Sequence, residues 1–196
     1  SGFDNYLITP NQQIHRLLTR LAVDNLLHPF QPFIIGQKGM APRIASDLGI
    51  SLIFYGENEA EYGNPIADTE TSLRSSAYYS LPDSEIFLSG VSIAELKGRY
   101  KIPEYELQQY KPISLDTLSK SKVEVHYLGY YLKWHPQSAY YYAVENGGFI
   151  PSPERTPGTY SKYNSIDDKV DDLHYWTTYI KFGIGRATYD ASQEIR

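Results

Sequence analysis

Apolar residues recur at helical spacing early in the chain. The segment 12–27 carries them three or four positions apart, which is typical of a helix with one apolar face: Ile14, Leu17, Leu18, Leu21 and Val23. Asn11 occupies the position expected of an N-cap residue, and His28, Pro29 and Pro32 predict where the helix ends. The preceding residues 3–9, which lead into Pro10, favour a short strand.

The pattern changes twice over the next residues. Residues 34–39 predict a strand or loop end, and residues 41–49 predict a helix with Pro42 in its first turn and Gly49 as its stop. Residues 50–56 are a run of β-branched and aromatic side chains, typical of a parallel strand covered on both faces.

Strand, helix, helix and strand outline an α/β fold with part of a doubly wound parallel sheet. Ligands of such sheets bind beyond the carboxyl ends of the strands. The polar segment from Gly56 to Gly63 falls at that place.

The second half of the chain predicts short elements. Residues 92–100 favour a helix, residues 122–134 a strand, and residues 137–148 a helix opened by Pro136. The proline-rich stretch 149–165 predicts a loop. Ser165 followed by Asp168 predicts the start of a helix over residues 166–183, and a last helical piece covers residues 188–196.

Composition excludes several classes of function. The net charge of −5 and pI near 5.5 give no reason to expect a nucleic-acid partner. The sequence has no cysteine, which excludes thiolate metal sites and cysteine nucleophiles. No apolar run approaches a membrane span, so we expect no membrane partner and a cytoplasmic location. The 19 tyrosines suit the wall of a half-polar binding site.

Three glutamates alternate directly after the second predicted strand. Glu57, Glu59 and Glu61 repel one another unless a cation compensates, and Mg²⁺ bridging to a phosphate is a natural compensator. The alternative is a solvated acidic turn that binds nothing.

Two further segments carry groups that could hold an anion. Lys38 lies between glycines and could hold a phosphate, although a tight turn with a surface lysine explains the pattern too. Residues 160–164 lie just before a predicted helix N-terminus, where backbone N–H groups attract anions. A sugar nucleotide or a carboxylated sugar would suit this segment, and an ordinary capping segment is the alternative.

Common catalytic signatures are missing. The five histidines are scattered without metal-ligand spacing, and no GxSxG elbow or GxxxxGK[ST] loop occurs.

Three segments together resemble the N-acetyl sugar amidotransferases of the pseudaminic and legionaminic acid type: residues 28–65, 123–149 and 158–196. These enzymes act in bacterial surface-glycan (lipopolysaccharide) biosynthesis and flagellin glycosylation. The family looks like a branch of the PP-loop ATP pyrophosphatases, which implies a Rossmann-like fold with a helical and loop C-terminal extension. It also implies three parts: the end of the nucleotide-binding domain (1–64), an insertion or lid (65–121) and a tyrosine-rich substrate region (122–196).

The resemblance implies a reaction. ATP adenylylates the acetamido oxygen of a sugar or of a CMP- or UDP-linked sugar, and ammonia displaces AMP to leave an acetamidino group. Without cysteine, the chain is expected to take ammonia from a separate glutaminase subunit. The family's SGGxDS-type loop is not in the sequence, so we expect it upstream of Ser1. Whether these residues alone turn over ATP is left open, as is an assembly of identical subunits.

The resemblance also implies roles for residues. It gives catalysis to the three glutamates and Lys38, and Mg²⁺ binding to the three glutamates alone. It gives substrate binding to the 160–164 segment with Lys181 and Arg186. The implied ATP-binding residues are Gly36, Gln37, Lys38, Arg43, Gly56 and Asn58. The implied sugar-binding residues are Tyr160, Lys162, Tyr163, Asn164, Lys181 and Arg186.

Two other functions remain open. One is a tRNA-modifying enzyme related to the PP-loop thiolases, although the missing cysteines and the acidic charge count against it. The other is a non-catalytic module that binds a carbohydrate or a partner.

Overall fold

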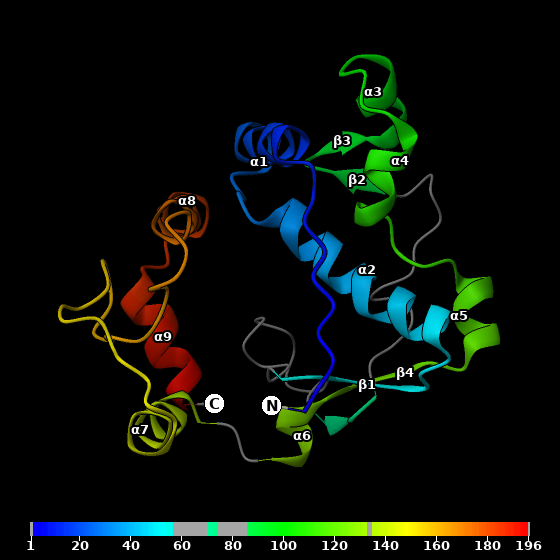
Figure 1. Ribbon diagram of the computed structural model, residues 1–196. Helices are drawn as coiled ribbons and strands as arrows, with labels where there is room; N and C mark the ends of the chain where they lie inside the picture. The colour runs from blue at the N-terminus through cyan, green and yellow to red at the C-terminus, as the bar shows by residue number, and fades with distance from the viewer. Residues whose placement is uncertain (1, 57–69, 74–85, 133–134, 196) are drawn as a thin grey trace.

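The computed structural model describes residues 2–56, 70–73, 86–132 and 135–195 (Figure 1). Helix α1 (Gln12–Leu26) begins where the sequence predicts. The Asn11 side chain accepts hydrogen bonds from the backbone N–H groups of Gln13 (3.1 Å) and Ile14 (3.5 Å). These N–H groups have no partner within the helix, so the cap fixes the helix start.

The strand predicted over residues 3–9 is wrong. Residues 2–11 have no regular secondary structure, and the side chains of Phe3 and Leu7 are 87% and 86% exposed. A strand is stable only beside another strand, and no described strand pairs with this segment.

Helix α2 (Gln31–Leu48) is continuous, so the strand or loop end predicted in its first half is wrong. Glycines weaken a helix by propensity, but here they have a tertiary role. A Cβ atom on Gly39 would lie 3.1 Å from the carbonyl oxygen of Lys111, and one on Gly36 would lie 3.6 Å from that of Gln109. The two glycines therefore let another backbone segment pass close to the helix.

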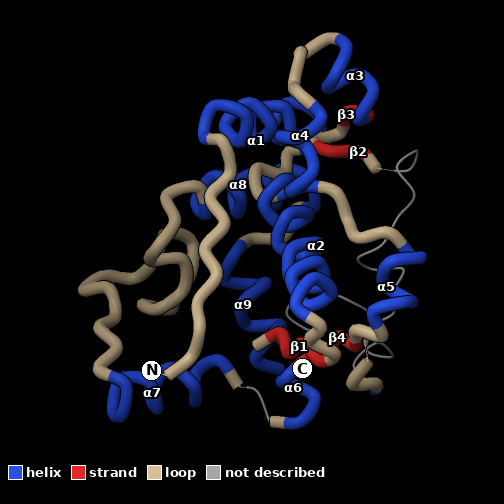
Figure 2. The backbone as a smooth tube through the Cα atoms, turned by 45° about the vertical axis from the view of Figure 1, so that its right-hand side comes forward, coloured by secondary structure: helices blue, strands red, loops and turns tan. Residues whose placement is uncertain are grey.

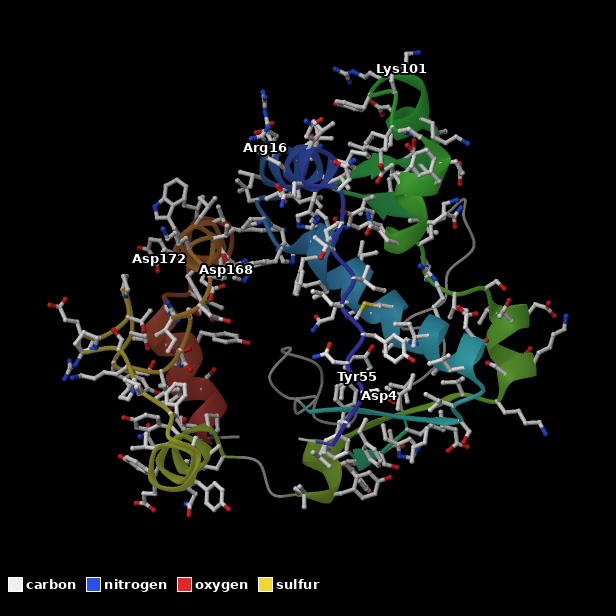
Figure 3. The ribbon with its side chains drawn as sticks, viewed as in Figure 1. Asp4, Arg16, Tyr55, Lys101, Asp168 and Asp172 are labelled. Atoms are coloured by element: carbon white, nitrogen blue, oxygen red, sulfur yellow. The ribbon has the colours of Figure 1, made fainter. Side chains whose placement is uncertain are left out.

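Pro42 lies inside α2 and not in a first turn. Proline has no N–H, so the carbonyl of Lys38, four residues earlier, lacks its usual helical donor. The hydroxyl of Tyr55 donates to this carbonyl across 3.4 Å, and Figure 3 labels this side chain at the end of the first strand. The helix ends at Gly49 with φ 68°, as predicted.

Strands β1 (Leu52–Tyr55) and β4 (Glu124–Tyr127) form a parallel two-stranded sheet, with Leu52 opposite Glu124 and Tyr55 opposite Tyr127. One face packs against a buried cluster with Ile53 and Tyr55 at its edge: Ala45, Ile113, Leu118, Val123 and Val125. Leu52 and Phe54 are 45% and 49% exposed. The sequence therefore predicts the strand correctly, but only one of its faces is well covered.

Residues 86–121, which are described and precede β4, fold onto α1 and α2. Their elements are β2 (Phe87–Leu88), β3 (Val91–Ser92), α3 (Ile93–Gly98), α4 (Glu104–Leu107), the 3₁₀ helix η5 (Gln108–Tyr110) and α5 (Leu115–Ser121). The predicted short helix near residues 92–100 is confirmed by α3, whose first turn is capped by the Ser92 hydroxyl. Apolar side chains of α1 and this segment form one buried cluster: Leu18, Leu21, Leu88, Val91, Leu96, Ile102, Leu107 and Tyr110.

The C-terminal residues form a helical region on one side of the molecule (Figure 1). A short helix, α6 (Leu128–Tyr131), follows β4, and then come α7 (Pro136–Gly147), α8 (Asp171–Phe182) and α9 (Arg186–Ile195). Helix α7 begins at Pro136 and is capped by Gly148 at φ 67°, which confirms the prediction. The predicted loop before α8 is confirmed as well.

The predicted start of α8 is wrong. The helix begins at Asp171, and Ser165 has a left-handed backbone with φ 53°. The Ser165 hydroxyl accepts a hydrogen bond from Nη2 of Arg186 (2.6 Å), and the Asp168 carboxylate accepts one from the Val170 N–H (2.8 Å). The Ser165 side chain therefore makes a long-range contact with Arg186 and does not act as the predicted N-cap.

Helix α8 contacts the corner between α1 and α2. Figure 2 also shows α8 close to α1. The His174 ring stacks on His28 with 5.2 Å between ring centres and meets Phe30 edge-on at 5.3 Å. Lys181 Nζ donates to the Leu26 carbonyl (3.1 Å).

The fold is α/β with a small parallel sheet. The described residues do not form a doubly wound sheet, because no described strand extends this pair as a parallel neighbour. The division at residues 64 and 121 stays a prediction. No helix in the described part of the chain is long and apolar enough to cross a membrane.

Candidate functional site

A cavity of about 550 Å³ lies between α7, the loop that precedes α8, and α9. Its volume is in the range of small-molecule sites. The lining combines aromatic rings with a few polar groups: Pro136, Ala139, Tyr140, Ala143, Phe149, Tyr160, Tyr163, Asn164, Ser165, Tyr175, Tyr189, Asp190 and Glu194. Five tyrosines thus meet in one cavity from α7, the loop before α8, α8 and α9.

An aromatic wall is held in a fixed arrangement. Tyr140 stacks on Tyr163 with 4.6 Å between ring centres and 19° between planes, and Phe149 meets Tyr140 edge-on at 6.2 Å. The Tyr163 hydroxyl donates to Oε1 of Gln137 (3.3 Å). Stacked and hydrogen-bonded rings lose little further freedom on binding, so the wall is preorganised.

Two carboxylates from α9 line the same cavity. Asp190 and Glu194 lie one helical turn apart, and their side chains are 11% and 22% exposed. The hydroxyl of Thr159 donates to Oδ2 of Asp190. This bond leaves other lone pairs of the carboxylate for a ligand, since each oxygen can accept two hydrogen bonds.

His135 orients Glu194. Its Nδ1 accepts from the backbone N–H of Ser138 (3.4 Å) and so caps α7. A neutral ring whose Nδ1 accepts carries its proton on Nε2, and Nε2 lies 3.1 Å from Oε2 of Glu194. The neutral tautomer therefore donates a hydrogen bond to this carboxylate.

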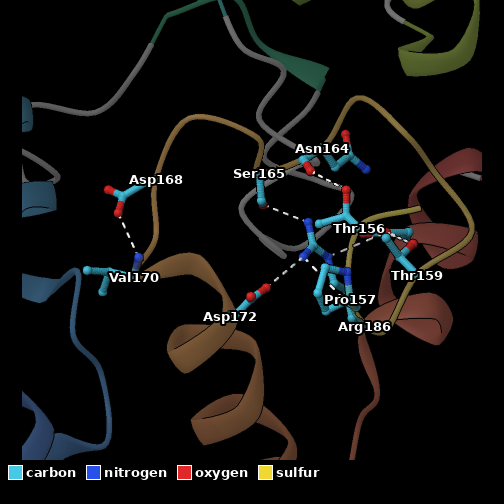
Figure 4. A network of polar contacts seen from close by, with 10 residues as sticks. Thr156, Pro157, Thr159, Asn164, Ser165, Asp168, Val170, Asp172 and Arg186 are labelled. Atoms are coloured by element: carbon cyan, nitrogen blue, oxygen red, sulfur yellow. Dashed lines mark hydrogen bonds and ion pairs between the residues drawn. The ribbon is translucent and has the colours of Figure 1, made fainter. Parts of the chain in front are cut away.

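Arg186 is the centre of the polar network behind the cavity (Figure 4). Its side chain is 2% exposed, and its guanidinium stacks over the Tyr175 ring at 4.0 Å. It donates to the Ser165 hydroxyl and to the Pro157 carbonyl (3.4 Å), and it pairs with Asp190 at 4.0 Å. Asp172 adds an ion pair at 3.9 Å. A buried charge with these partners holds the loop against α8 and α9.

The loop closes on itself around Thr156. The Thr156 N–H donates to the Ser161 carbonyl (3.0 Å), and its hydroxyl donates to the Asn164 carbonyl (2.7 Å). The Ala187 N–H at the start of α9 donates to the carbonyl of Gly158 (3.0 Å). The cavity residues of this loop are thereby fixed without an apolar core.

The cavity disfavours negative charge at its tyrosines. Burial raises the pKa of the Tyr163 hydroxyl to about 12, and the carboxylate of Glu194 adds to the rise. Burial raises the pKa of Tyr160 as well, followed by the effects of Glu194 and Asp190. These hydroxyls therefore stay protonated and can act as hydrogen-bond donors at neutral pH.

The structure brings together half of the predicted sugar-binding residues. Tyr160, Tyr163 and Asn164 line the cavity. Lys162 does not, because its Nζ donates to the Pro153 carbonyl (2.9 Å). Lys181 lies at the contact with α1. Arg186 is sealed behind the lining, so it is not placed to pair with a substrate carboxylate.

Three predicted ATP-binding residues lie at a second cavity, of about 260 Å³, beside α2: Gly36, Gln37 and Arg43. The cavity is bordered by the stacked pair of His15 and Tyr110. The guanidinium of Arg43 donates to the Lys111 carbonyl, and burial lowers its pKa. Because residues 36–38 are mid-helix, their backbone N–H groups face helical carbonyls. This segment therefore does not fit the role of a phosphate-wrapping loop.

The predicted metal site cannot be placed. Glu57, Asn58, Glu59 and Glu61 lie outside the described residues, whereas Gly56 follows β1 at its carboxyl end. Within the described ranges, His, Asp and Glu side chains form no group of three that could hold a metal ion.

Sequence reasoning missed the two α9 carboxylates and Tyr140, Tyr175 and Tyr189. A signal for the carboxylates was present, because Asp190 and Glu194 are four residues apart in a segment predicted to be helical, which places them on one face. The tyrosines carried no such signal, since they converge only through the tertiary fold.

An aromatic cavity with carboxylate and amide groups is typical of a protein that binds a polar, ring-shaped small molecule. Residues 157–196 match a protein-family model described as "LPS biosynthesis protein WbpG-like, C-terminal domain". This match covers α8, α9 and most of the lining loop. It supports a family of glycan biosynthesis enzymes for this region. No curated protein matches the chain.

Proposed function

We propose that this chain binds an acetamido sugar in the cavity between α7 and α9 for an ATP-dependent amidotransferase reaction in surface-glycan biosynthesis. One observation carries the proposal. The residues that match a lipopolysaccharide-biosynthesis family contribute Tyr160, Tyr163, Asn164, Asp190 and Glu194 to a single cavity. The sequence resemblance described above adds the amidotransferase chemistry.

The lining suits an acetamido sugar for physical reasons. The C–H face of a sugar ring is apolar and can pack on the Tyr140–Tyr163 stack. Sugar hydroxyls and the acetamido N–H are donors, and the Asp190 and Glu194 carboxylates are acceptors. The acetamido carbonyl is an acceptor, and the protonated Tyr160 hydroxyl is a donor.

In the proposed reaction, ATP would convert the acetamido oxygen into a leaving group as AMP, with release of pyrophosphate, so that ammonia replaces it. The described residues do not form a phosphate cradle at Gly36–Lys38, and we assign no described residue to ATP or Mg²⁺. The part proposed for this chain is to hold the sugar ring and to fix its acetamido group. A glutaminase partner as the source of ammonia is part of the same proposal.

The test is ligand binding by NMR titration of the 196-residue chain. The probes are the methyl glycoside of N-acetylglucosamine and methyl glucoside, which carries a hydroxyl in place of the acetamido group. We expect the acetamido glycoside to bind more tightly. We expect Tyr163→Ala to weaken this binding about tenfold, because it removes one stacked ring. Tyr142→Ala is the matched control, since Tyr142 is 70% exposed on α7 and does not line the cavity.

Equal binding of the two glycosides, or equal effects of the two tyrosine variants, would contradict the proposed sugar site. The reaction itself is tested with a UDP-linked acetamido sugar, ATP, Mg²⁺ and ammonium. AMP together with a sugar in which NH replaces oxygen, detected by mass spectrometry, would support it. A modified sugar formed without AMP would contradict the ATP-dependent route.

A further inference from the structure

The cavity carries more negative than positive charge at its lining. Asp190 and Glu194 are ionisable lining residues on one face of α9, and none of the described residues that line the cavity is a Lys or Arg. Their side chains are largely buried, at 11% and 22% exposure. Charges in such a site are less screened than on the surface, so their sign matters to a ligand.

Nearby positive groups only partly offset these carboxylates. The Arg186 guanidinium shares its charge between Asp190 at 4.0 Å and Asp172 at 3.9 Å, and it donates to the Ser165 hydroxyl. His135 meets Glu194 as a hydrogen-bond donor in its neutral tautomer. Glu194 therefore faces the cavity without a permanently charged partner among the described residues.

The negative charge of the cavity also affects the pKa of two tyrosine hydroxyls that line it. The rise in the pKa of Tyr163 and of Tyr160 comes first from burial and then from Glu194. The cavity therefore disfavours a bound group that carries negative charge and favours a bound cation.

The proposed reaction creates such a cation. An amide is neutral at pH 7, whereas an amidine is a strong base that takes up a proton and becomes an amidinium. An amidinium is planar and directs N–H donors from both nitrogens, as a guanidinium does, so it matches a carboxylate in a charge-assisted pair.

We propose that the cavity binds the positively charged acetamidino form of its sugar more tightly than the neutral acetamido form, with Glu194 as the main selecting group. This inference rests on the proposed sugar site. Its consequence is that product leaves more slowly than substrate and inhibits the reaction.

The experiment compares two methyl glycosides that differ only in an acetamido or an acetamidino group, titrated into the full chain at pH 7. A charge-assisted hydrogen bond predicts about tenfold tighter binding of the acetamidino form. Glu194→Gln keeps the shape and removes the charge, so the preference should fall to near one. Glu145→Gln is the matched control, because Glu145 is exposed on α7 and does not line the cavity.

The outcomes separate this inference from the proposed function. If the acetamido form binds and the acetamidino form binds no more tightly, the charge preference is overturned and the sugar site stands. If neither form binds to the folded protein, both are overturned. A preference that survives in Glu194→Gln would also overturn the assignment to this carboxylate, provided that circular dichroism shows the variant to be folded.

Discussion

The two halves of the molecule are held together by different forces. Residues 12–127 bury apolar side chains such as Leu18, Leu88 and Val125, each at 0% exposure. In residues 135–195, the buried side chains are all polar: Thr156, Ser161, Thr177 and Arg186. The N-terminal half is therefore stabilised mainly by apolar burial, and the C-terminal half by a hydrogen-bonded network around one cation.

This difference explains where the larger of the two described cavities lies. Apolar cores pack to high density, and the cavity beside α2 in the N-terminal half has less than half the volume of the one beside α7. A polar network fixes side chains by direction, and it can hold rings apart around an open space. The cavity between α7 and α9 is such a space.

The largest effect is expected from Arg186→Ala. It leaves the buried Asp190 carboxylate without its cation and removes the donor to Ser165, which should cost about 4 kcal/mol of unfolding free energy. Hydrogen exchange should show the loss in residues 135–195, with little change in α1. Arg155→Ala, in the exposed part of the same loop, is the control. Equal destabilisation of both halves would contradict the claim that Arg186 stabilises the C-terminal half alone.

Leu18→Ala should act on the other half. Leu18 is fully buried in the cluster between α1 and the β2–β3 hairpin, so its truncation should cost about 3 kcal/mol. Urea denaturation measures this loss. Leu115→Ala is the matched control because Leu115 is 54% exposed. The prediction fails if the two variants are equally stable.

Acidification should weaken the contact between the two halves, and this effect should be smaller than that of either substitution. Burial, with His174, Lys181 and Lys38 nearby, lowers the pKa of His28 to about 4, and burial also lowers the pKa of His174. The unfolded state then binds more protons, so stability is full above pH 6.5 and is lost as the pH falls from 6.5 toward 4. With the exposed part of the ring discounted, we expect about 1 kcal/mol.

Thermal melts between pH 7 and pH 4 measure this effect. His28→Gln should flatten the dependence, because the group that takes up the proton is gone. The carboxylates are the same in both proteins, so the difference between the two curves isolates His28. Identical curves would contradict a role for this ring at the junction.

The sequence predicted elements whose causes are local. α1 is an example, because Asn11 and the apolar spacing are both within its own segment. The strand β1 and the helix α7 with its closing glycine are others. These signals act within a few residues, so one sequence suffices to detect them.

Elements shaped by distant contacts were not predicted. Gly39 in α2 is explained by the Lys111 carbonyl, which is far away in the chain. The Ser165 hydroxyl binds Arg186 instead of capping a helix. The candidate site divides in the same way, since Tyr160, Tyr163 and Asn164 were predicted from one loop, while Tyr140 and Glu194 join them only through tertiary folding.

We propose that the polar C-terminal half is the sugar-binding half. Hydrogen–deuterium exchange of the whole chain, with and without a saturating methyl glycoside of N-acetylglucosamine, tests it most directly. We expect slower exchange in α7, in the loop around Thr156 and in α9, with α1 and α2 unchanged. Protection confined to residues 12–127, or none at all, would contradict it.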